Sequence, residues 1–178
     1  MVITLIGYRG TGKSTVAPLL AAQLGWNWVD ADVEIETRTG ESIAAIFARE
    51  GEAGFRSREA GVMADLLMRN QLVLAAGGGA ILNPETRQAI RAAGPAVWLT
   101  ASLDTIASRL ADDPTTTGRR PALTDQAPRS EIAAVLAIRA PLYAETASLT
   151  LNTEGRSATA LVDEIVLALP GLIARRSR

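Results

Sequence analysis

The chain has 178 residues, of which 48% are hydrophobic and 21% charged, and its net charge is −1. These values fit one globular domain with its own core and exclude the strongly basic surface of a typical nucleic-acid-binding protein. Cysteine and histidine are both absent, which excludes disulfides, thiolate or imidazole metal ligands and histidine catalysis. Chemistry is left to carboxylates, Lys, Arg, backbone N–H groups or a metal bound by oxygen.

The sequence carries no signal for a membrane or for secretion. No apolar stretch approaches the roughly 18 residues needed to cross a membrane, and Met1 leads into an apolar run without a basic flank. We therefore expect a cytoplasmic location. Because no repeat, coiled-coil heptad, linker or interface stripe is visible, we also expect a single domain over residues 1–178 that is a monomer.

Short apolar runs alternate with longer segments of helical period along the chain. Five strands are predicted, over residues 2–6, 26–29, 72–76, 96–99 and 148–151. Helices are predicted over residues 14–24, 42–50, 57–69, 84–93, 103–110, 129–143 and 157–169. The alternation indicates an α/β fold, a parallel sheet with helices on both faces.

A glycine-rich sequence follows the first predicted strand and matches the pattern G-x-x-x-x-G-K-[ST], with the residues Gly7-Tyr8-Arg9-Gly10-Thr11-Gly12-Lys13-Ser14-Thr15. Its glycines let backbone N–H groups surround phosphate oxygens, and the next helix adds its positive N-terminal dipole. Lys13, the only lysine in the chain, is expected to reach the β- and γ-phosphates of ATP, and Ser14 to bind Mg²⁺. The segment from Gly10 to Thr15 is therefore the predicted nucleotide-binding loop, and a turn that only caps a helix is the weak alternative.

Two carboxylates, Asp30 and Asp32, follow the second predicted strand. In doubly wound sheets the carboxyl ends of the strands face the ligand crevice. We expect Asp30 to help order Mg²⁺ and Asp32 to hold the hydroxyl of an acceptor. For one of the two, capping of a helix is an equal alternative.

Three glycines, Gly77, Gly78 and Gly79, end the third predicted strand. Such a run is usually kept where a ligand or another backbone comes close, and a flexible turn is the alternative. Arg56 and Arg139 each stand beside apolar residues. For either arginine the alternative is an ordinary surface side chain lying along its helix.

A polar stretch rich in turn formers occupies residues 111–121. Its composition predicts a mobile surface loop, with a plain solvated connector as the alternative. It contains the paired arginines Arg119 and Arg120, which favour a lid over the site.

Taken together, these motifs resemble those of shikimate kinases over nearly the whole chain. The resemblance rests on the glycine-rich loop, Asp30 and Asp32, Phe55-Arg56 with Glu59, Gly77 to Gly79, Arg120-Pro121-Ala122-Leu123, and Arg139-Ala140-Pro141-Leu142-Tyr143. It implies a P-loop fold like that of nucleoside-monophosphate kinases, with strand order 2-3-1-4-5, a mobile lid over residues 111–127 and an acceptor-binding region over residues 32–61. It also implies phosphorylation of shikimate at its 3-hydroxyl by ATP with Mg²⁺, in chorismate and aromatic amino acid biosynthesis.

The resemblance assigns roles to further residues. Asp32 holds the acceptor hydroxyl and takes its proton, while Arg56 and Arg139 bind the carboxylate beside the backbone of Gly77 to Gly79. Arg120 closes onto the phosphates with the lid, so that Lys13, Asp32 and Arg120 are the expected catalytic residues.

Arg109 and Arg156 border the adenine in this scheme. Two departures from the family pattern bear on these roles. The segment before Arg120 is longer than is common, and Ala122 stands where the family usually has leucine.

Three other functions compete with this one. The nearest are kinases of gluconate or of a nucleoside monophosphate. Few aromatic residues stand near the proposed acceptor site to bind the base of a nucleotide, whereas gluconate carries a carboxylate and is harder to exclude on charge alone. A nucleotide-dependent switch or binding module without an acceptor has no need for Asp32, Arg56 and Arg139 in one pocket. Release of ADP that depends on an acceptor separates these hypotheses.

Overall fold

One parallel sheet forms the centre of the molecule, in a computed structural model that describes residues 1–112 and 128–176. Its strands are β1 (Val2–Ile6), β2 (Asn27–Asp30), β3 (Leu72–Ala75), β4 (Ala96–Thr100) and β5 (Leu149–Asn152). They are paired in the order β2-β3-β1-β4-β5, and every pair is parallel. The predicted doubly wound sheet and its strand order are confirmed.

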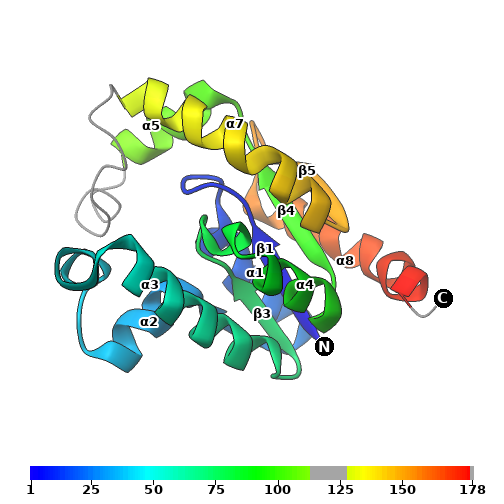
Figure 1. The fold of residues 1–178 in the computed structure, drawn as a ribbon. Helices are drawn as coiled ribbons and strands as arrows, with labels where there is room; N and C mark the ends of the chain where they lie inside the picture. The colour runs from blue at the N-terminus through cyan, green and yellow to red at the C-terminus, as the bar shows by residue number, and fades with distance from the viewer. Residues whose placement is uncertain (113–127, 177–178) are drawn as a thin grey trace.

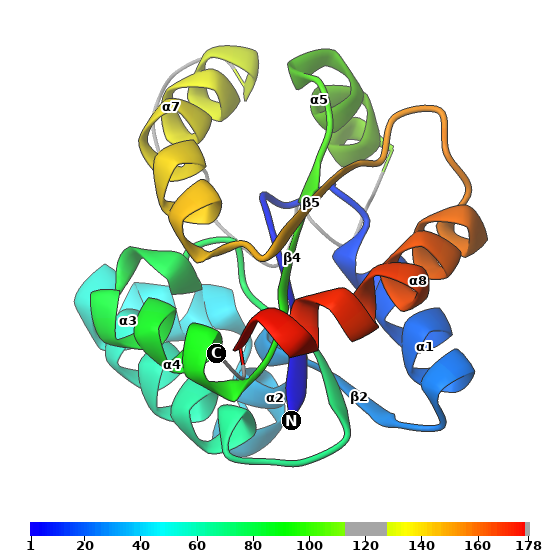
Figure 2. The ribbon, with the colours of Figure 1, turned by 90° about the vertical axis from the view of Figure 1, so that its right-hand side faces the viewer.

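Helices cover both faces of the sheet (Figure 1). They are α1 (Lys13–Leu24), α2 (Ala31–Thr39), α3 (Ile43–Leu67), α4 (Pro84–Ala93), α5 (Leu103–Ala111), α7 (Pro128–Thr146) and α8 (Ala158–Arg176), with a short 3₁₀ helix η1 (Ala80–Leu82). Figure 2 shows α1 and α8 on one side of the sheet and α3 and α4 on the other. In the described part of the chain, no helix has the length and apolar character needed to cross a membrane.

The central strands β3, β1 and β4 are largely apolar and buried because helices cover both faces of the sheet, whereas most residues of the edge strands β2 and β5 are partly or fully exposed. All five residues of β1 are buried. Val2 and Ile6 lie in the core that α3 and α4 cover, whereas Ile3 and Leu5 pack against α1 and α8. This alternation sets which side chains of β1 face each helix layer. The parallel pairing with β3 and β4 places the loop after Ile6 at the carboxyl edge of the sheet.

Two helical segments differ from the predicted ones near the site. Helix α2 is absent from the predicted elements because only Ala31 and Ile35 of it are buried, too few to give a visible apolar period. The predicted helices over residues 42–50 and 57–69 both form and together make up α3, with a break at Gly51 (φ 69°, ψ −175°), but the second begins earlier than predicted, directly after this glycine. Arg56 therefore lies on a helix and not in a connection.

The other differences lie away from these segments. Residues 80–82 form η1, which follows the three glycines and is not predicted. The last helix continues past its predicted end at residue 169, through Pro170. Buried Leu169 and Leu172 flank this proline in the sequence. We attribute the continuation to their burial, which offsets the lost backbone hydrogen bond and the clash of the proline ring with the preceding turn.

Replacement of Gly94 by alanine should strongly destabilise the fold. A Cβ atom at this position would lie 1.8 Å from the carbonyl oxygen of Val2 on the central strand, and neither backbone can move without disturbing the sheet. We expect Gly94→Ala to lower the free energy of unfolding by about 3 kcal/mol, measured by urea denaturation.

Gly171→Ala is the matched control for this variant. Gly171 lies in α8, and a Cβ there would meet nothing within 4 Å. The same substitution should therefore raise stability by about 0.5–1 kcal/mol. A Gly94→Ala variant as stable as the wild type would contradict the packing of β1 against this glycine.

Candidate active site

A pocket of about 600 Å³ opens at the carboxyl edge of the sheet. It brings together predicted site residues from distant parts of the chain: Gly10, Thr11, Gly12, Lys13, Ser14, Thr15, Asp30, Asp32, Arg56, Gly77, Gly78, Arg109, Arg139 and Arg156. Gly79 is not among the lining residues but lies against the guanidinium of Arg56. Arg119 and Arg120, with most of the predicted lid, fall outside the described residues.

The glycine-rich loop has the conformation expected of a phosphate-binding loop. Gly10 and Gly12 adopt φ values of 77° and 91°, which residues with a Cβ rarely adopt. Gly12 is the N-cap of α1 and offers no side-chain cap to its first N–H groups. These N–H groups and the helix dipole are therefore directed at whatever lies in the loop, an arrangement that favours an anion.

The Lys13 side chain lies within this loop. Its Nζ atom donates to the carbonyl oxygens of Gly7 and Tyr8, both at 2.9 Å, and the residue is only 8% exposed. Thr11 Oγ1 donates to the same Tyr8 carbonyl at 2.7 Å. The ammonium group is thus held beside the loop backbone, where a bound phosphate would lie.

Ser14, at the start of α1, and Asp30, at the end of β2, place two oxygen atoms that could bind a metal ion next to each other. Ser14 Oγ donates to Asp30 Oδ2 at 2.6 Å, and hydroxyl and carboxylate oxygens are ligands that Mg²⁺ accepts. Within the described residues there is no cluster of three acidic residues that could hold a metal ion by protein ligands alone. The residues present fit an ion that takes its remaining ligands from phosphate and water, as Mg²⁺ does at nucleotide sites.

Asp30 also positions Asp32. Asp30 is the N-cap of α2, and its Oδ1 accepts from the backbone N–H groups of Asp32 at 3.0 Å and Val33 at 3.5 Å. The helix-capping alternative thus holds for Asp30, which caps α2 and contacts Ser14 at once. Asp32 follows in the first turn of α2 and lines the pocket.

Arg56 is oriented by two acidic residues of its own helix. Its Nη1 donates to Glu59 Oε2 at 2.6 Å, and its Nε and Nη2 donate to Glu52 Oε1 at 3.3 and 3.2 Å. Burial alone would lower the pKa of Arg56, but the charges and hydrogen bonds of Glu59 and Glu52 outweigh it and raise that pKa. The guanidinium therefore stays charged in a largely buried position.

Arg139 approaches the same region from α7. It is 7% exposed, and its Nη1 donates to the carbonyl oxygen of Gly78 at 3.1 Å. A Cβ added to Gly79 would lie 2.3 Å from Arg56 Nη1. The two guanidinium groups thus contact consecutive glycines and both line one pocket, an arrangement suited to a carboxylate.

Arg109 connects the nucleotide-binding loop to the end of β5. Its Nη1 donates to the Gly10 carbonyl at 3.2 Å and to Thr153 Oγ1 at 3.0 Å, and its Nη2 donates to the Thr153 carbonyl at 3.2 Å. Arg156 lies on the same side of the pocket, and its Nη2 donates to Glu164 Oε2 at 2.5 Å. These contacts hold Arg109 beside the loop.

The pocket also contains residues that were not predicted as site residues. They are chiefly Trp28, Phe47 and Thr153. The buried Glu59 does not line the pocket but pairs with Arg56, which does. Glu59 is one of the residues that carry the family resemblance, which assigns it no role, although its spacing of three residues from Arg56 on a helix predicts an ion pair. Phe47 stacks on Phe55 with ring centroids 4.6 Å apart, a contact across the Gly51 kink that no local pattern indicates.

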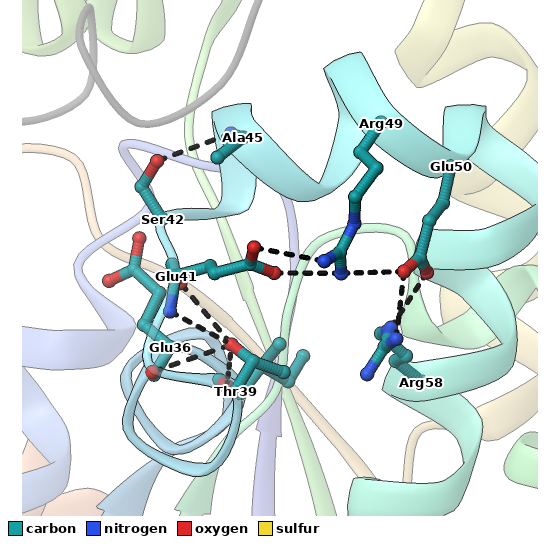
Figure 3. A network of polar contacts seen from close by, with 9 residues as sticks. Glu36, Thr39, Glu41, Ser42, Ala45, Arg49, Glu50 and Arg58 are labelled. Atoms are coloured by element: carbon teal, nitrogen blue, oxygen red, sulfur yellow. Dashed lines mark hydrogen bonds and ion pairs between the residues drawn. The ribbon is translucent and has the colours of Figure 1, made fainter.

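A chain of ion pairs spans this kink in α3 (Figure 3). Arg49 bridges Glu41 and Glu50 at 2.7 and 2.6 Å, and Glu50 accepts two hydrogen bonds from Arg58, at 2.7 and 2.8 Å. Glu50 lies before Gly51 and Arg58 after it. The network therefore joins the half of α3 that carries Phe47 to the half that carries Arg56.

The chain is similar to known proteins in both sequence and structure. The family model described as shikimate kinase matches residues 9–170. The chain belongs to the shikimate kinase family. Members of this family are ATP-dependent kinases that act on shikimate, so the chain is a phosphotransferase of the shikimate pathway.

Individual members of the family are similar along almost their whole length. The shikimate kinase of Rhodopirellula baltica is 46% identical over 171 residues, which cover 96% of this chain and 91% of that protein. The shikimate kinase of Acinetobacter baumannii, solved in complex with shikimate, is 38% identical with a TM-score of 0.89, over 96% of this chain and 93% of that chain. A gluconokinase from Sinorhizobium meliloti, at 17% identity and a TM-score of 0.60 over 99% and 93% of the two chains, shares the fold alone.

The Glu50 ion pairs should make stability depend on pH. Hydrogen bonding from Arg58 holds the pKa of Glu50 below its ordinary value of 4.5. A carboxylate with a lowered pKa adds stability above its ordinary pKa and loses that contribution as the pH falls through the lowered value. We therefore expect Glu50→Gln to lower the thermal midpoint slightly at neutral pH, with the difference from the wild type shrinking as the pH falls below 4.5.

The Arg58→Met variant provides the control for this measurement. In an Arg58→Met background the effect of Glu50→Gln at neutral pH should shrink, since the main partner is gone. A difference between wild type and Glu50→Gln that is constant over the acidic range would show that the ion pair does not contribute.

Proposed function

We propose that this kinase transfers the γ-phosphoryl group of ATP to the 3-hydroxyl of shikimate, with Asp32, Arg56 and Arg139 binding the acceptor. The observation that supports this most directly is one pocket in which a phosphate-binding loop faces a carboxylate and two arginines. The loop suits the donor. The three charged side chains suit a small hydroxylated acid.

On the donor side, the backbone N–H groups from Gly10 to Thr15 would bind phosphate oxygens, and Lys13 would neutralise charge on the β- and γ-phosphates. Ser14 and Asp30, joined at 2.6 Å, would hold Mg²⁺. When bound, this ion supplies positive charge that orients the phosphates and stabilises the transition state.

On the acceptor side, Arg56 and Arg139 would bind the carboxylate of shikimate through paired hydrogen bonds. Both are already oriented, Arg56 by Glu59 and Glu52 and Arg139 by the Gly78 carbonyl. Little conformational entropy is then lost when the acceptor binds. The backbone of Gly77 to Gly79 would contact the ring from the same side.

Asp32 would accept the proton of the 3-hydroxyl. As the hydroxyl oxygen forms its bond to the γ-phosphorus, the bond from that phosphorus to the β–γ bridging oxygen breaks, and ADP leaves with the electron pair. Phosphoryl transfer depends mainly on alignment and charge stabilisation. The charges of Lys13 and the proposed lid residue Arg120, with Arg119 as its neighbour, would supply the latter.

Two further parts of the site have proposed roles, the arginines beside the adenine and the lid. Arg109, fixed to Thr153 and Gly10, would border the adenine together with Arg156. A lid over residues 111–127 would exclude water from the phosphates.

We also propose that the enzyme acts as a monomer in the cytoplasm, which light scattering of the purified protein and fractionation of its cells would test.

ADP release by the purified protein tests the proposed reaction. The assay supplies Mg-ATP with shikimate, gluconate or a nucleoside monophosphate in turn, and NMR of the product identifies the phosphorylated hydroxyl. Rapid release with shikimate alone and a 3-phosphate product would support the proposal. Phosphate on another hydroxyl would overturn the pose in which Asp32 receives the proton.

Asp32→Asn should reduce kcat by about 10²–10⁴-fold because the amide cannot accept the proton. ATP affinity, measured by calorimetry, should stay within about two-fold of the wild type, since Asp32 faces the acceptor. Asp163→Asn is the control: Asp163 lies on α8, outside the lining of the pocket. A weakened ATP affinity in Asp32→Asn alone would contradict the proposed division of the site.

Arg139→Ala should raise the KM for shikimate about 100-fold, because a buried guanidinium that binds the carboxylate is lost. The KM for ATP should change little. Arg91→Ala is the matched control, since Arg91 pairs with Glu145 at 2.8 Å on the surface. Equal increases in both KM values for Arg139→Ala would show that Arg139 does not discriminate the acceptor side from the donor side.

A further inference from the structure

The carbonyl oxygen of Gly78 accepts two hydrogen bonds from one helix. Tyr143 Oη donates to it at 2.5 Å and Arg139 Nη1 at 3.1 Å. The two donors are one turn apart on α7 and both are buried, Tyr143 completely. The Tyr143 bond joins residues that are 65 positions apart in the sequence.

The hydroxyl bond is separate from the packing of the tyrosine ring. The ring lies in the core on the α3 and α4 side of the sheet and stacks on Trp98 of β4, with centroids 5.6 Å apart. Phenylalanine would keep these apolar contacts. The other tyrosine of the chain, Tyr8, is also buried, yet its hydroxyl has no hydrogen-bond partner among the described residues. Burial of a tyrosine in this fold does not by itself produce such a bond.

The bond fixes the orientation of a peptide unit in the site. The Gly78–Gly79 peptide is trans, so its C=O and N–H groups point in opposite directions. Anchoring the Gly78 carbonyl on α7 therefore turns the Gly79 N–H away from that helix. The flanking carbonyls of Gly77 and Gly79 accept from the N–H groups of Ala80 and Leu82. The Gly78 carbonyl between them is bound by the two side chains of α7.

The same peptide separates the two arginines. Arg139 touches it through the Gly78 carbonyl, and Arg56 lies against Gly79, where an added Cβ would be 2.3 Å from Nη1 and 2.5 Å from Nη2. The orientation of the glycines thus sets where each guanidinium can lie. The distance between the guanidiniums in turn decides how well both can bind one carboxylate.

We propose that Tyr143 is a positioning residue for the acceptor: its hydroxyl holds the Gly78–Gly79 peptide between Arg139 and Arg56. This inference rests on the proposed binding of the shikimate carboxylate by these arginines. Tyr143 also gives the Gly78 carbonyl a second donor beside Arg139 Nη1. Without the hydroxyl, this partly buried carbonyl would depend on Nη1 alone, and that donor would be less available to the acceptor, since an unpaired carbonyl is costly.

The test compares Tyr143→Phe with Thr146→Val. Thr146 is buried on the same helix, and its Oγ1 donates at 2.7 Å to the Leu142 carbonyl within that helix. Both variants lose one partly buried hydrogen bond from a hydroxyl group, but only the first loses a bond to the glycines. We expect Tyr143→Phe to raise the KM for shikimate about 10-fold and to leave the KM for ATP within about two-fold, with Thr146→Val changing neither.

The outcomes separate this inference from the proposed function. If the wild type phosphorylates shikimate and Tyr143→Phe has the kinetics of Thr146→Val, the positioning role is wrong and the proposed function stands. Equal increases in both KM values for Tyr143→Phe would also overturn it. If the wild type releases no ADP with shikimate, the proposed function fails and the inference fails with it.

A second variant approaches the peptide from the other side. Gly79→Ala would push the far end of the Arg56 side chain away, a change that the fold can accommodate. It should give the same selective rise in the KM for shikimate, and it serves if Tyr143→Phe does not fold. An unchanged KM for shikimate in Gly79→Ala would overturn the inference.

Discussion

The 2.6 Å hydrogen bond between Ser14 Oγ and Asp30 Oδ2 joins the two sides of the site. Ser14 belongs to the nucleotide-binding loop, and Asp30 ends β2 and caps α2. The other oxygen of the Asp30 carboxylate accepts the Asp32 N–H and so fixes the start of α2, on which Asp32 lies. One carboxylate thereby relates the position of the transferred phosphoryl group to the position of the residue proposed to take the proton. A displacement of Asp30 would disturb alignment at both, and alignment is the main contribution a protein makes to this chemistry.

The site binds anions without a strong positive field. The chain has a net charge of −1, and Arg56 is paired with Glu59 and Glu52. These acids offset much of the long-range attraction of the guanidinium for a substrate. What remains is orientation, since a guanidinium held in one place presents its donors to a carboxylate at short range. Recognition of the acceptor therefore depends on geometry more than on electrostatic steering.

The parts of this fold that the sequence predicts are those in which local pattern and tertiary environment agree. The glycine-rich loop can be predicted from the sequence because its backbone conformation and its function both require the same residues at fixed spacing. The buried strands can be predicted from their apolar runs. Helix α2 has only two buried residues and gives no such pattern. The contact of Arg139 with Gly78 spans 61 positions, so local reasoning leaves Arg139 as an ordinary surface side chain, and only the family resemblance places it at the acceptor. The ion pairs across Gly51 depend on a kink that spacing alone does not reveal.

This contrast reflects how the two sides of the pocket are built. The phosphate-binding part of the donor side is a single short segment whose shape is maintained by its own backbone and by Lys13, which donates to Gly7 and Tyr8. The acceptor side takes one arginine from α3, another from α7 and a glycine turn between them, and its geometry exists only when these elements are packed together. Interactions between distant segments are lost when packing loosens, whereas contacts within a short segment persist longer. Recognition of the acceptor is therefore the property most closely tied to the integrity of the whole fold, and phosphate binding depends chiefly on the loop and the first turn of α1.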